Sequence, residues 1–227
     1  MTTMNFQTVK IEENIEILRN YFSPLSKDPS VKPTDREKFT TWIERFDIIM
    51  EKISAFDKNA LPKIESDLGY RLSNRNLVLT AITQPSVKNT FREIKDHFRN
   101  TPEIPISQTD LMLLEECSDT AGSLAWAGDN AIKLAILLDA WRPGIKPVEL
   151  HNRRQDLETN KNLSKLCDQW QLFEHRIRLD EGKPDQKTTE KIEGTLVEAI
   201  YGVIFIEKKM RGVQAALHLI NPSKNFC

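Results

Sequence analysis

The spacing of apolar residues constrains the fold of this 227-residue chain more than any other feature, because it follows the period of an α-helix over most of the length. The clearest run repeats apolar residues every three or four positions: Phe39, Trp42, Ile43, Phe46, Ile49, Ile53 and Phe56. That interval places them on one face of an amphipathic helix. Stretches that alternate apolar and polar residues, as half-buried strands do, are absent. The sequence therefore predicts an all-α protein.

Residues 1–60 are expected to form a helical extension that precedes the main helical domain, residues 61–227. A first helix is expected from about Lys10 to Tyr21, and the stretch Ser23–Pro33 separates it from the amphipathic helix. Thr34 and Glu37 have the spacing of a capping box, in which each side chain satisfies a free backbone N–H at the start of a helix. We expect this extension to pack on the main domain or on a partner.

The main domain is expected to contain helices only. Gly69 is expected to end one helix in the left-handed conformation, and the next helix runs from Ser73 to Pro85. The polar residues 88–108 predict a loop with one helical turn, and a long helix follows from Asp110 to Trp141 with a break near Gly122. The remaining expected helices are Val148–Thr159, Leu163–Trp170, Thr188–Lys209 and Arg211–Leu219.

The composition excludes several classes of protein. The chain has 32 Lys and Arg residues against 33 Asp and Glu residues, and this balance excludes a uniformly basic nucleic-acid binder but not a local basic surface. The longest apolar tract, Leu124–Trp141, contains charged residues and is not expected to span a membrane, and the start of the chain has no signal-peptide core. Cys117, Cys167 and Cys227 fit neither a disulfide framework nor a zinc site, which favours a reducing compartment such as the cytoplasm.

Two apolar stretches of helix each carry one carboxylate, Asp129 within Leu124–Ile132 and Glu198 within Thr195–Gly202. An isolated buried carboxylate costs several kcal/mol unless it is paired or bound to a metal. Gly128 and Gly202 are poor helix formers. Their presence inside helices is explained if the two helices approach closely enough for the acids to share an ion. Lys133 lies one turn after Asp129 and offers it an ordinary ion pair instead.

Four segments resemble, in order, the motifs of the ribonuclease III family. The family's usual forms are LGY-F with LL-QALTHPS, then LEFLGDA, R…SNE-LA-L and EALIGAIY. The corresponding segments here are Leu68–Leu72 with Leu77–Ser86, Leu124–Ala131, Arg153–Leu166 and Glu198–Phe205. The sequence is therefore similar to this family over about residues 64–220, which implies an all-α ribonuclease III-like endonuclease domain.

The resemblance has two gaps at the metal site. The family places four carboxylates around its metal, but Ala125 and Thr195 stand here where it usually has glutamate and aspartate. Only Asp129 and Glu198 remain as catalytic metal ligands. The same pattern is found in the Mini-ribonuclease III branch, which resembles this chain further because it has no double-stranded-RNA-binding domain.

The resemblance implies a homodimer that hydrolyses double-stranded or structured RNA with Mg²⁺, for which Mn²⁺ is a substitute. Two acids suffice in principle, because Mg²⁺ is commonly held by one or two carboxylates together with water and substrate phosphate. Thr195 is a candidate for orienting a water molecule, although a helical threonine often bonds its own backbone instead. Because duplex RNA is recognised through phosphates and 2′-hydroxyls, basic residues are needed near the site. The candidates are Arg153, Arg154, Lys187 and Lys191.

Two other interpretations stay open at this point. The alternative to the nuclease is a catalytically inert module of the same fold, which would bind RNA or assemble with proteins. Loss of two family acids favours that alternative, and retention of Asp129 and Glu198 favours the nuclease. A helical structural protein with a chance resemblance conflicts with four motifs in order.

Overall fold

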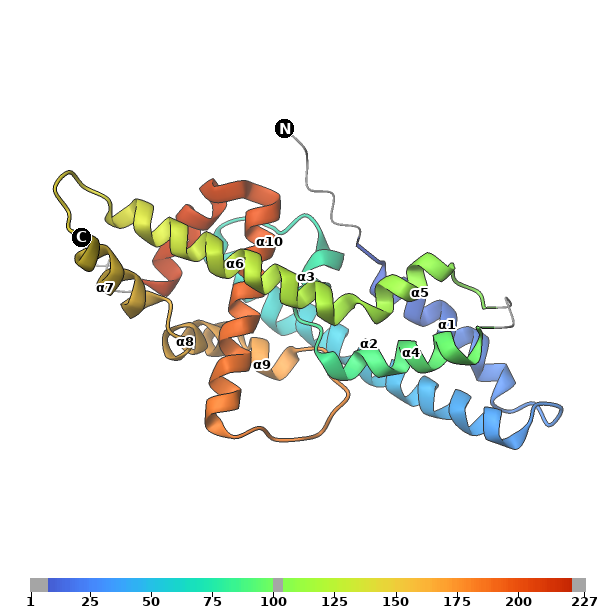
Figure 1. The fold of residues 1–227 in the computed structure, drawn as a ribbon. Coiled ribbons are helices and arrows are strands. Elements are labelled where there is room, and N and C mark those ends of the chain that lie inside the picture. Colours follow the sequence, from blue (N-terminus) through green and yellow to red (C-terminus); the bar gives the residue numbers. More distant parts are fainter. Residues whose placement is uncertain (1–7, 100–103, 222–227) are drawn as a thin grey trace.

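Helices form nearly all of the regular structure in the computed structural model, which describes residues 8–99 and 104–221 (Figure 1). In chain order they are α1 (Ile11–Leu25), α2 (Pro33–Leu68), α3 (Arg75–Ala81), the 3₁₀ turn η1 (Pro85–Val87), α4 (Lys88–His97), α5 (Gln108–Glu115), α6 (Cys117–Ala140), α7 (Pro147–Leu157), α8 (Asn160–Trp170), α9 (Leu172–His175) and α10 (Gln186–Ile220). These residues contain no β-strand, and one isolated bridge joins Thr83 to Ile177. The prediction of an all-α protein is confirmed. No helix within the described ranges is long and apolar enough to cross a membrane.

The predicted amphipathic helix is α2, and its apolar face packs against α1. The Phe22 ring of α1 lies 5.2 Å from the Phe39 ring and 5.1 Å from the Trp42 ring, measured between centroids, and all three side chains are buried. Helix α1 continues through Pro24, so the separating stretch is shorter than expected. Helix α2 passes residue 60 without interruption, and the division of the chain at that residue stays a prediction.

The predicted capping box at the start of α2 is wrong. Pro33 is the first residue of the helix, and Lys32 before it makes no side-chain cap. Proline suits the first helical position because the N–H it lacks would have no partner there. The helix therefore begins one residue before Thr34, and Thr34 lies inside it. At the other end, Gly69 has φ 73°, which confirms the predicted left-handed cap.

The loop predicted over residues 88–108 is also wrong for much of its length. Residues Lys88–His97 form α4, which buries Phe91 and Ile94 on one side and leaves polar side chains on the other. The few apolar residues of this segment lie at helical spacing. They suffice to stabilise a helix because α5 provides a surface against which they pack. Residues 100–103 of the predicted loop lie outside the described residues.

The long helix predicted from Asp110 to Trp141 is interrupted, but not at Gly122. The break lies at Glu116, between α5 and α6, while Gly122 sits inside α6 with open space around it. The break predicted between the last two helices is confirmed, because Lys209 has a non-helical backbone (φ 59°, ψ −163°) that bends α10.

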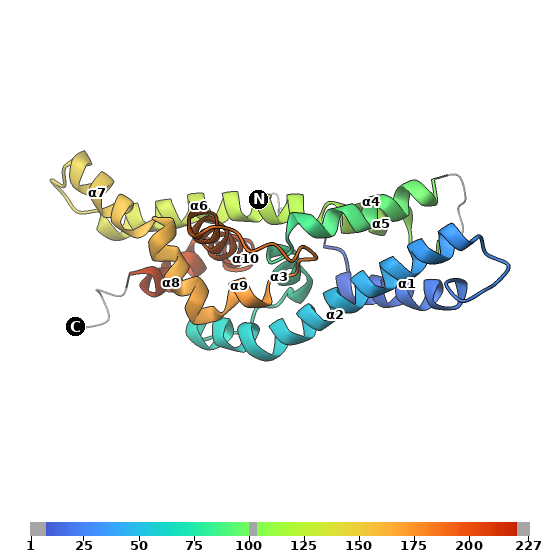
Figure 2. The same ribbon diagram turned by 90° about the horizontal axis from the view of Figure 1, so that it is seen from below.

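Helices α6 and α10 form the centre of the main domain and make its most extensive helix–helix contact. In Figure 2, α6 extends along one side of the molecule and α2 along the opposite side, with α3, α9 and α10 between them. Helix α10 is consequently buried over most of its middle, including Val197, Ile200 and Tyr201. The two predicted acidic helices are therefore neighbours.

Candidate metal centre and its surroundings

The two acidic helices cross with their backbones in contact, and two glycines make this possible. A Cβ atom added to Gly128 of α6 would lie 1.8 Å from the carbonyl oxygen of Glu198, and one added to Gly202 of α10 would lie 2.2 Å from the carbonyl oxygen of Leu124. No side chain larger than hydrogen fits at either position. The expectation that these glycines mark a close helix approach is confirmed.

Asp129 and Glu198 lie beside this crossing and influence each other's charge. Burial, and then the negative charge of Asp129, raise the pKa of Glu198 to about 7, while Lys133 lowers it and Glu158 adds a smaller upward effect. The two carboxylates therefore repel each other in a partly buried setting. Glu158, at the end of α7, is a third acid of this neighbourhood that the sequence did not single out.

Lys133 forms a direct ion pair with only one of the two acids. Its Nζ donates to Oδ2 of Asp129 at 2.7 Å, one helical turn away along α6, as the alternative interpretation of the sequence expected. No hydrogen bond or ion pair of the Glu198 carboxylate is present within the described residues. The site is thus a pair of carboxylates with one ammonium group, which is paired with Asp129.

The donor set fits a hard divalent cation bound by few protein ligands. Ala125 is buried and brings no oxygen to the site, and the described residues contain no cluster of three His, Cys, Asp or Glu that could hold a metal ion. Mg²⁺ needs no such cluster, because it keeps several waters and takes one or two carboxylates together with substrate phosphate. A cation at Asp129 and Glu198 would also neutralise the repulsion between them.

The hydroxyl of Thr195 donates to the carbonyl oxygen of Lys191 at 2.9 Å, within its own helix. The alternative expected for a helical threonine is therefore present. Thr195 and Lys191 line the same cavity of about 350 Å³ beside α10.

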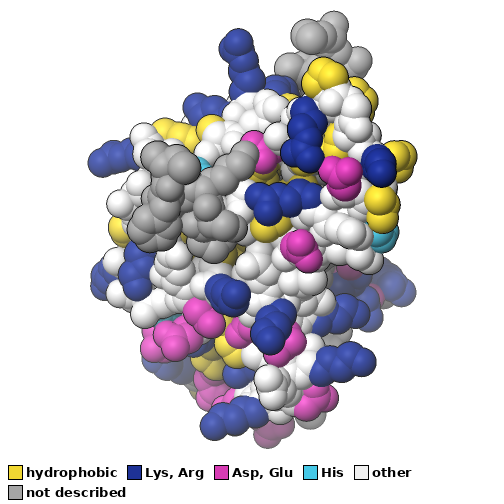
Figure 3. All heavy atoms as spheres, turned by 90° about the vertical axis from the view of Figure 1, so that its left-hand side faces the viewer, with side chains coloured by type: hydrophobic (Ala, Val, Ile, Leu, Met, Phe, Trp, Pro, Cys, Tyr) yellow, Lys and Arg dark blue, Asp and Glu magenta, His cyan; other side chains and the backbone are white. Residues whose placement is uncertain are grey.

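The basic residues proposed for RNA contact fall into two groups. Lys187 and Lys191 are exposed on the first turns of α10. Arg154 lies on α7, where its Nε is 3.3 Å from Oε2 of Glu158. Arg153, also on α7, lines a hollow at the end of α6 that lies apart from Thr195. The end of the molecule that carries α7 shows Lys and Arg side chains interspersed with Asp and Glu (Figure 3).

An apolar stripe remains exposed along α6. Trp126 is 73% exposed and Trp141, just after the helix, is 68% exposed; Leu134 and Leu138 between them are also exposed. These positions recur at helical spacing and so share one face. Trp126 therefore does not pack in the core of its own chain.

Comparisons with known proteins show what the chain is similar to. Residues 122–209, which include both acids and the helix crossing, match the model of the ribonuclease III domain. The chain is also similar to the solved nuclease domain of ribonuclease III from Campylobacter jejuni, a structure that concerns flexibility in a region involved in dimer formation. The sequence identity is 21% and the TM-score is 0.49, and the match covers 72% of this chain and 96% of that one. No curated protein matches the sequence.

The chain therefore carries a ribonuclease III domain over residues 122–209. The domain is that of a family of endoribonucleases, which are phosphodiester hydrolases acting on double-stranded RNA.

Proposed function

We propose that this chain is a Mg²⁺-dependent endoribonuclease that hydrolyses phosphodiester bonds in double-stranded or structured RNA. The observation that carries the proposal is the placement of Asp129 and Glu198 side by side at the α6–α10 crossing, where the pKa of Glu198 is raised to about 7. Retaining two repelling carboxylates in a partly buried place destabilises the fold, and binding a cation offsets that cost. Perturbed acids of this kind concentrate at functional sites.

Asp129 and Glu198 would hold Mg²⁺ or Mn²⁺ through their carboxylate oxygens. A divalent cation at this place supplies a Lewis acid that polarises a phosphoryl oxygen and activates a water molecule for attack on phosphorus. Glu198 must be ionised for this role, and its carboxylate competes with a proton near neutral pH. Asp129 must exchange its contact with Lys133 for the cation, and Lys133 is then free to approach a phosphate oxygen.

Recognition of the RNA requires cations along the path of its backbone, since duplex RNA is read by shape. Lys187 and Lys191 on α10 lie on the approach to Glu198, and Arg153 and Arg154 lie on α7 beyond it. Thr195, one turn before Glu198, is exposed, and its hydroxyl oxygen, whose hydrogen is donated to Lys191, would accept a hydrogen bond from a water molecule and so orient it.

The exposed stripe on α6 supports a homodimer as the active particle. A second copy of the chain would cover Trp126, Leu134, Leu138 and Trp141, which are otherwise exposed to solvent. Each particle would then carry two identical sites, one per chain.

We further propose a cytoplasmic location. Cys117 and Cys167 are free and buried, and burial raises the pKa of both thiols to about 12, so neither is poised for oxidation. Cys227 lies outside the described residues.

A second function is favoured by one observation. The contact of 2.7 Å between Lys133 and Asp129, together with Ala125 and Thr195 in place of acids, is what an inert RNA-binding or assembly module of the same fold would keep. A single experiment distinguishes the two functions. The purified protein is incubated with labelled duplex RNA in Mg²⁺, in Mn²⁺ and in EDTA. Cleavage with either metal and none in EDTA supports the nuclease. Intact RNA across both titrations, with RNA still bound, establishes the inert module instead.

A further inference from the structure

Arg176 is a buried cation that has no anionic partner in contact. The residue is only 4% exposed. Its guanidinium carbon lies 3.5 Å from the centre of the Phe173 ring, and Nη1 donates to the Phe173 carbonyl oxygen. Among the ion pairs of the described residues none includes Arg176, and Asp180 and Glu193 act on it only through weaker, longer-range attraction. Buried charges are ordinarily paired.

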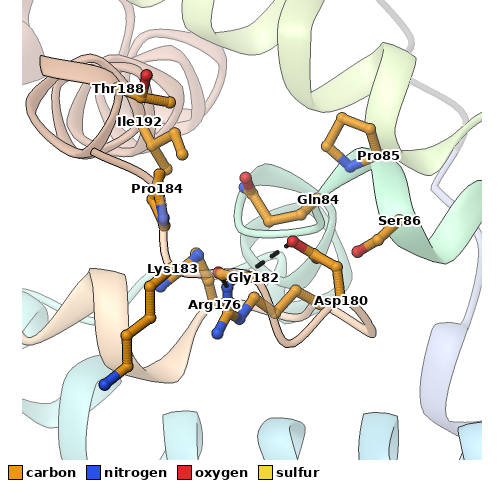
Figure 4. A pocket seen from close by; sticks show the side chains of 11 residues that line it. Gln84, Pro85, Ser86, Arg176, Asp180, Gly182, Lys183, Pro184, Thr188 and Ile192 are labelled. Carbon is orange, nitrogen blue, oxygen red and sulfur yellow. Dashed lines mark hydrogen bonds and ion pairs between the residues drawn. The ribbon is translucent and has the colours of Figure 1, made fainter. Parts of the chain in front are cut away.

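Arg176 lines a cavity of about 520 Å³ together with a second arginine, Arg178. Figure 4 shows this cavity, with Thr188 and Ile192 of α10 on one side and Gln84, Pro85 and Ser86 on the other. Nη1 of Arg178 donates to the carbonyl oxygen of Gly182 at 2.9 Å and lies 3.8 Å from Oδ2 of Asp180. The lining therefore contains two guanidinium groups, the ammonium group of Lys183 and one carboxylate, with hydroxyl groups on both sides.

The segment that carries the two arginines is held rigidly in place. Between the arginines, Ile177 exchanges backbone hydrogen bonds with the segment before η1: its N–H donates to the Ile82 carbonyl at 3.0 Å, and its carbonyl accepts from the Gln84 N–H at 2.8 Å. The N–H of Leu179 donates to Oγ of Ser86 at 3.0 Å. The guanidinium groups are thus fixed before any ligand arrives, which lowers the entropic cost of binding.

Burial and the positive charge of Arg178 lower the pKa of Arg176 to about 10, so the group remains charged at neutral pH but in an unfavourable setting. An anion in the cavity would relieve both effects. Paired guanidinium groups are particularly suited to phosphoryl oxygens, which accept several charge-assisted hydrogen bonds at once.

The cavity continues toward the candidate metal centre. It shares Gln84, Pro85, Thr188 and Ile192 with the cavity that contains Lys191 and Thr195. Thr188 and Thr195 are two helical turns apart on one face of α10, about 10 Å along its axis. Glu198 follows Thr195 by less than one turn. A strand that lies in this trough would reach from the arginines to the acids.

We propose that the pocket formed by Arg176 and Arg178 binds a phosphoryl group, and, resting on the proposed function, that this group is a backbone phosphate of the RNA strand on its way to Asp129 and Glu198. The carboxylate of Asp180 then competes with the phosphate for Arg178, and the incoming phosphate displaces this carboxylate.

The test uses the full chain and compares three variants, with Arg176→Met as a fourth if it folds. Arg178→Gln removes one guanidinium, Asp180→Asn removes the competing charge, and Arg19→Gln is a matched control that removes the same charge from α1 on the far side of the fold. Arg176→Met is informative only if its circular dichroism spectrum matches the wild type, because Arg176 also packs on Phe173. Two probes are measured in EDTA, so that cleavage plays no part: inorganic phosphate by calorimetry, and a short duplex RNA by fluorescence anisotropy over a range of salt concentrations.

If the phosphoryl group belongs to RNA, Arg178→Gln weakens RNA binding by about tenfold or more and reduces the salt slope by about one, and phosphate competes with RNA. If the natural ligand is a free phosphate, Arg178→Gln abolishes phosphate binding while RNA binding equals that of Arg19→Gln. In both cases Asp180→Asn strengthens phosphate binding. The proposal is overturned if all three variants bind both probes as the wild type does. None of these results depends on cleavage, so an inert protein that binds phosphate here would refute the proposed function and leave this site standing.

Discussion

Replacing Gly128 with alanine tests the helix crossing that positions the two acids. The new Cβ would lie 1.8 Å from the Glu198 carbonyl oxygen, 2.6 Å from the Gly202 nitrogen and 2.9 Å from the Glu198 carbonyl carbon. Ordinary carbon–oxygen contacts are about 3.3 Å or longer, so α6 and α10 must move apart by more than 1 Å. Every opposing atom belongs to the backbone, and no side-chain rotation relieves the clash.

Overpacking of a core costs about 1–3 kcal/mol and occasionally more. Because the new Cβ of Gly128→Ala meets backbone atoms that cannot rotate away, its cost lies at the upper end of this range. Alanine recovers up to about 1 kcal/mol of helix propensity, leaving a net loss of about 2 kcal/mol or more. Gly122→Ala is the matched control on the same helix, because Gly122 has nothing within 4 Å of its added Cβ. It should gain up to about 1 kcal/mol.

Urea denaturation followed by circular dichroism measures both free energies of unfolding. The two variants should differ by about 3 kcal/mol, with Gly128→Ala the less stable. Equal midpoints, or a more stable Gly128→Ala, would show that α6 and α10 do not cross in contact, and the reasoning about the site would fail with it.

Three further predictions concern the acids and the exposed stripe. Because the pKa of Glu198 is raised, the folded protein binds more protons than the unfolded chain between about pH 4.5 and 7, so this group lowers stability as pH rises through that range. In metal-free denaturation experiments, Glu198→Gln should therefore be more stable than the wild type at pH 8, by a free energy of unfolding on the order of 2 kcal/mol. At pH 4.5 the two proteins should have nearly equal stability. A difference that does not change with pH would count against the burial of this acid. Lys133→Ala should raise the affinity of Asp129 for Mg²⁺ severalfold in calorimetry, and an unchanged affinity would mean that the ion pair does not compete with the metal. Trp126→Asp should convert a micromolar dimer to a monomer in sedimentation without loss of helix content, whereas a wild type that sediments as a monomer refutes the dimer.

The helices that follow from apolar spacing could be predicted, and those that depend on distant partners could not. Helix α2 is evident because its apolar stripe is long and regular. Helix α4 has too few apolar residues to be recognised alone, and it forms because α5 packs against them. Gly122 was expected to break a helix, but an exposed glycine costs only about 1 kcal/mol inside one, and the chain instead breaks at Glu116.

The acids of the candidate site were accessible from the sequence because each is the one acid of an apolar stretch, Leu124–Ile132 or Thr195–Gly202, and Lys133 because it follows Asp129 by one turn. Glu158 was missed, although its distance of four residues from Arg154 predicts their ion pair. Arg176 and Arg178 carry no sequence signal of this kind. Their significance depends on burial and on the backbone pairing of Ile177 with the segment before η1, which lies more than ninety residues earlier in the chain.

Single-turnover cleavage of a labelled duplex RNA by wild type, Asp129→Asn and Glu198→Gln tests the central claim most directly. Both substitutions keep the size of the side chain and remove the charge that would hold Mg²⁺, and neither Ala125 nor Thr195 supplies a carboxylate to compensate. The account predicts cleavage by the wild type that is lost by orders of magnitude in each variant, with RNA binding equal or tighter because a charge that repels phosphate is gone. Variants that cleave as fast as the wild type would contradict the assignment of these two acids as the metal ligands.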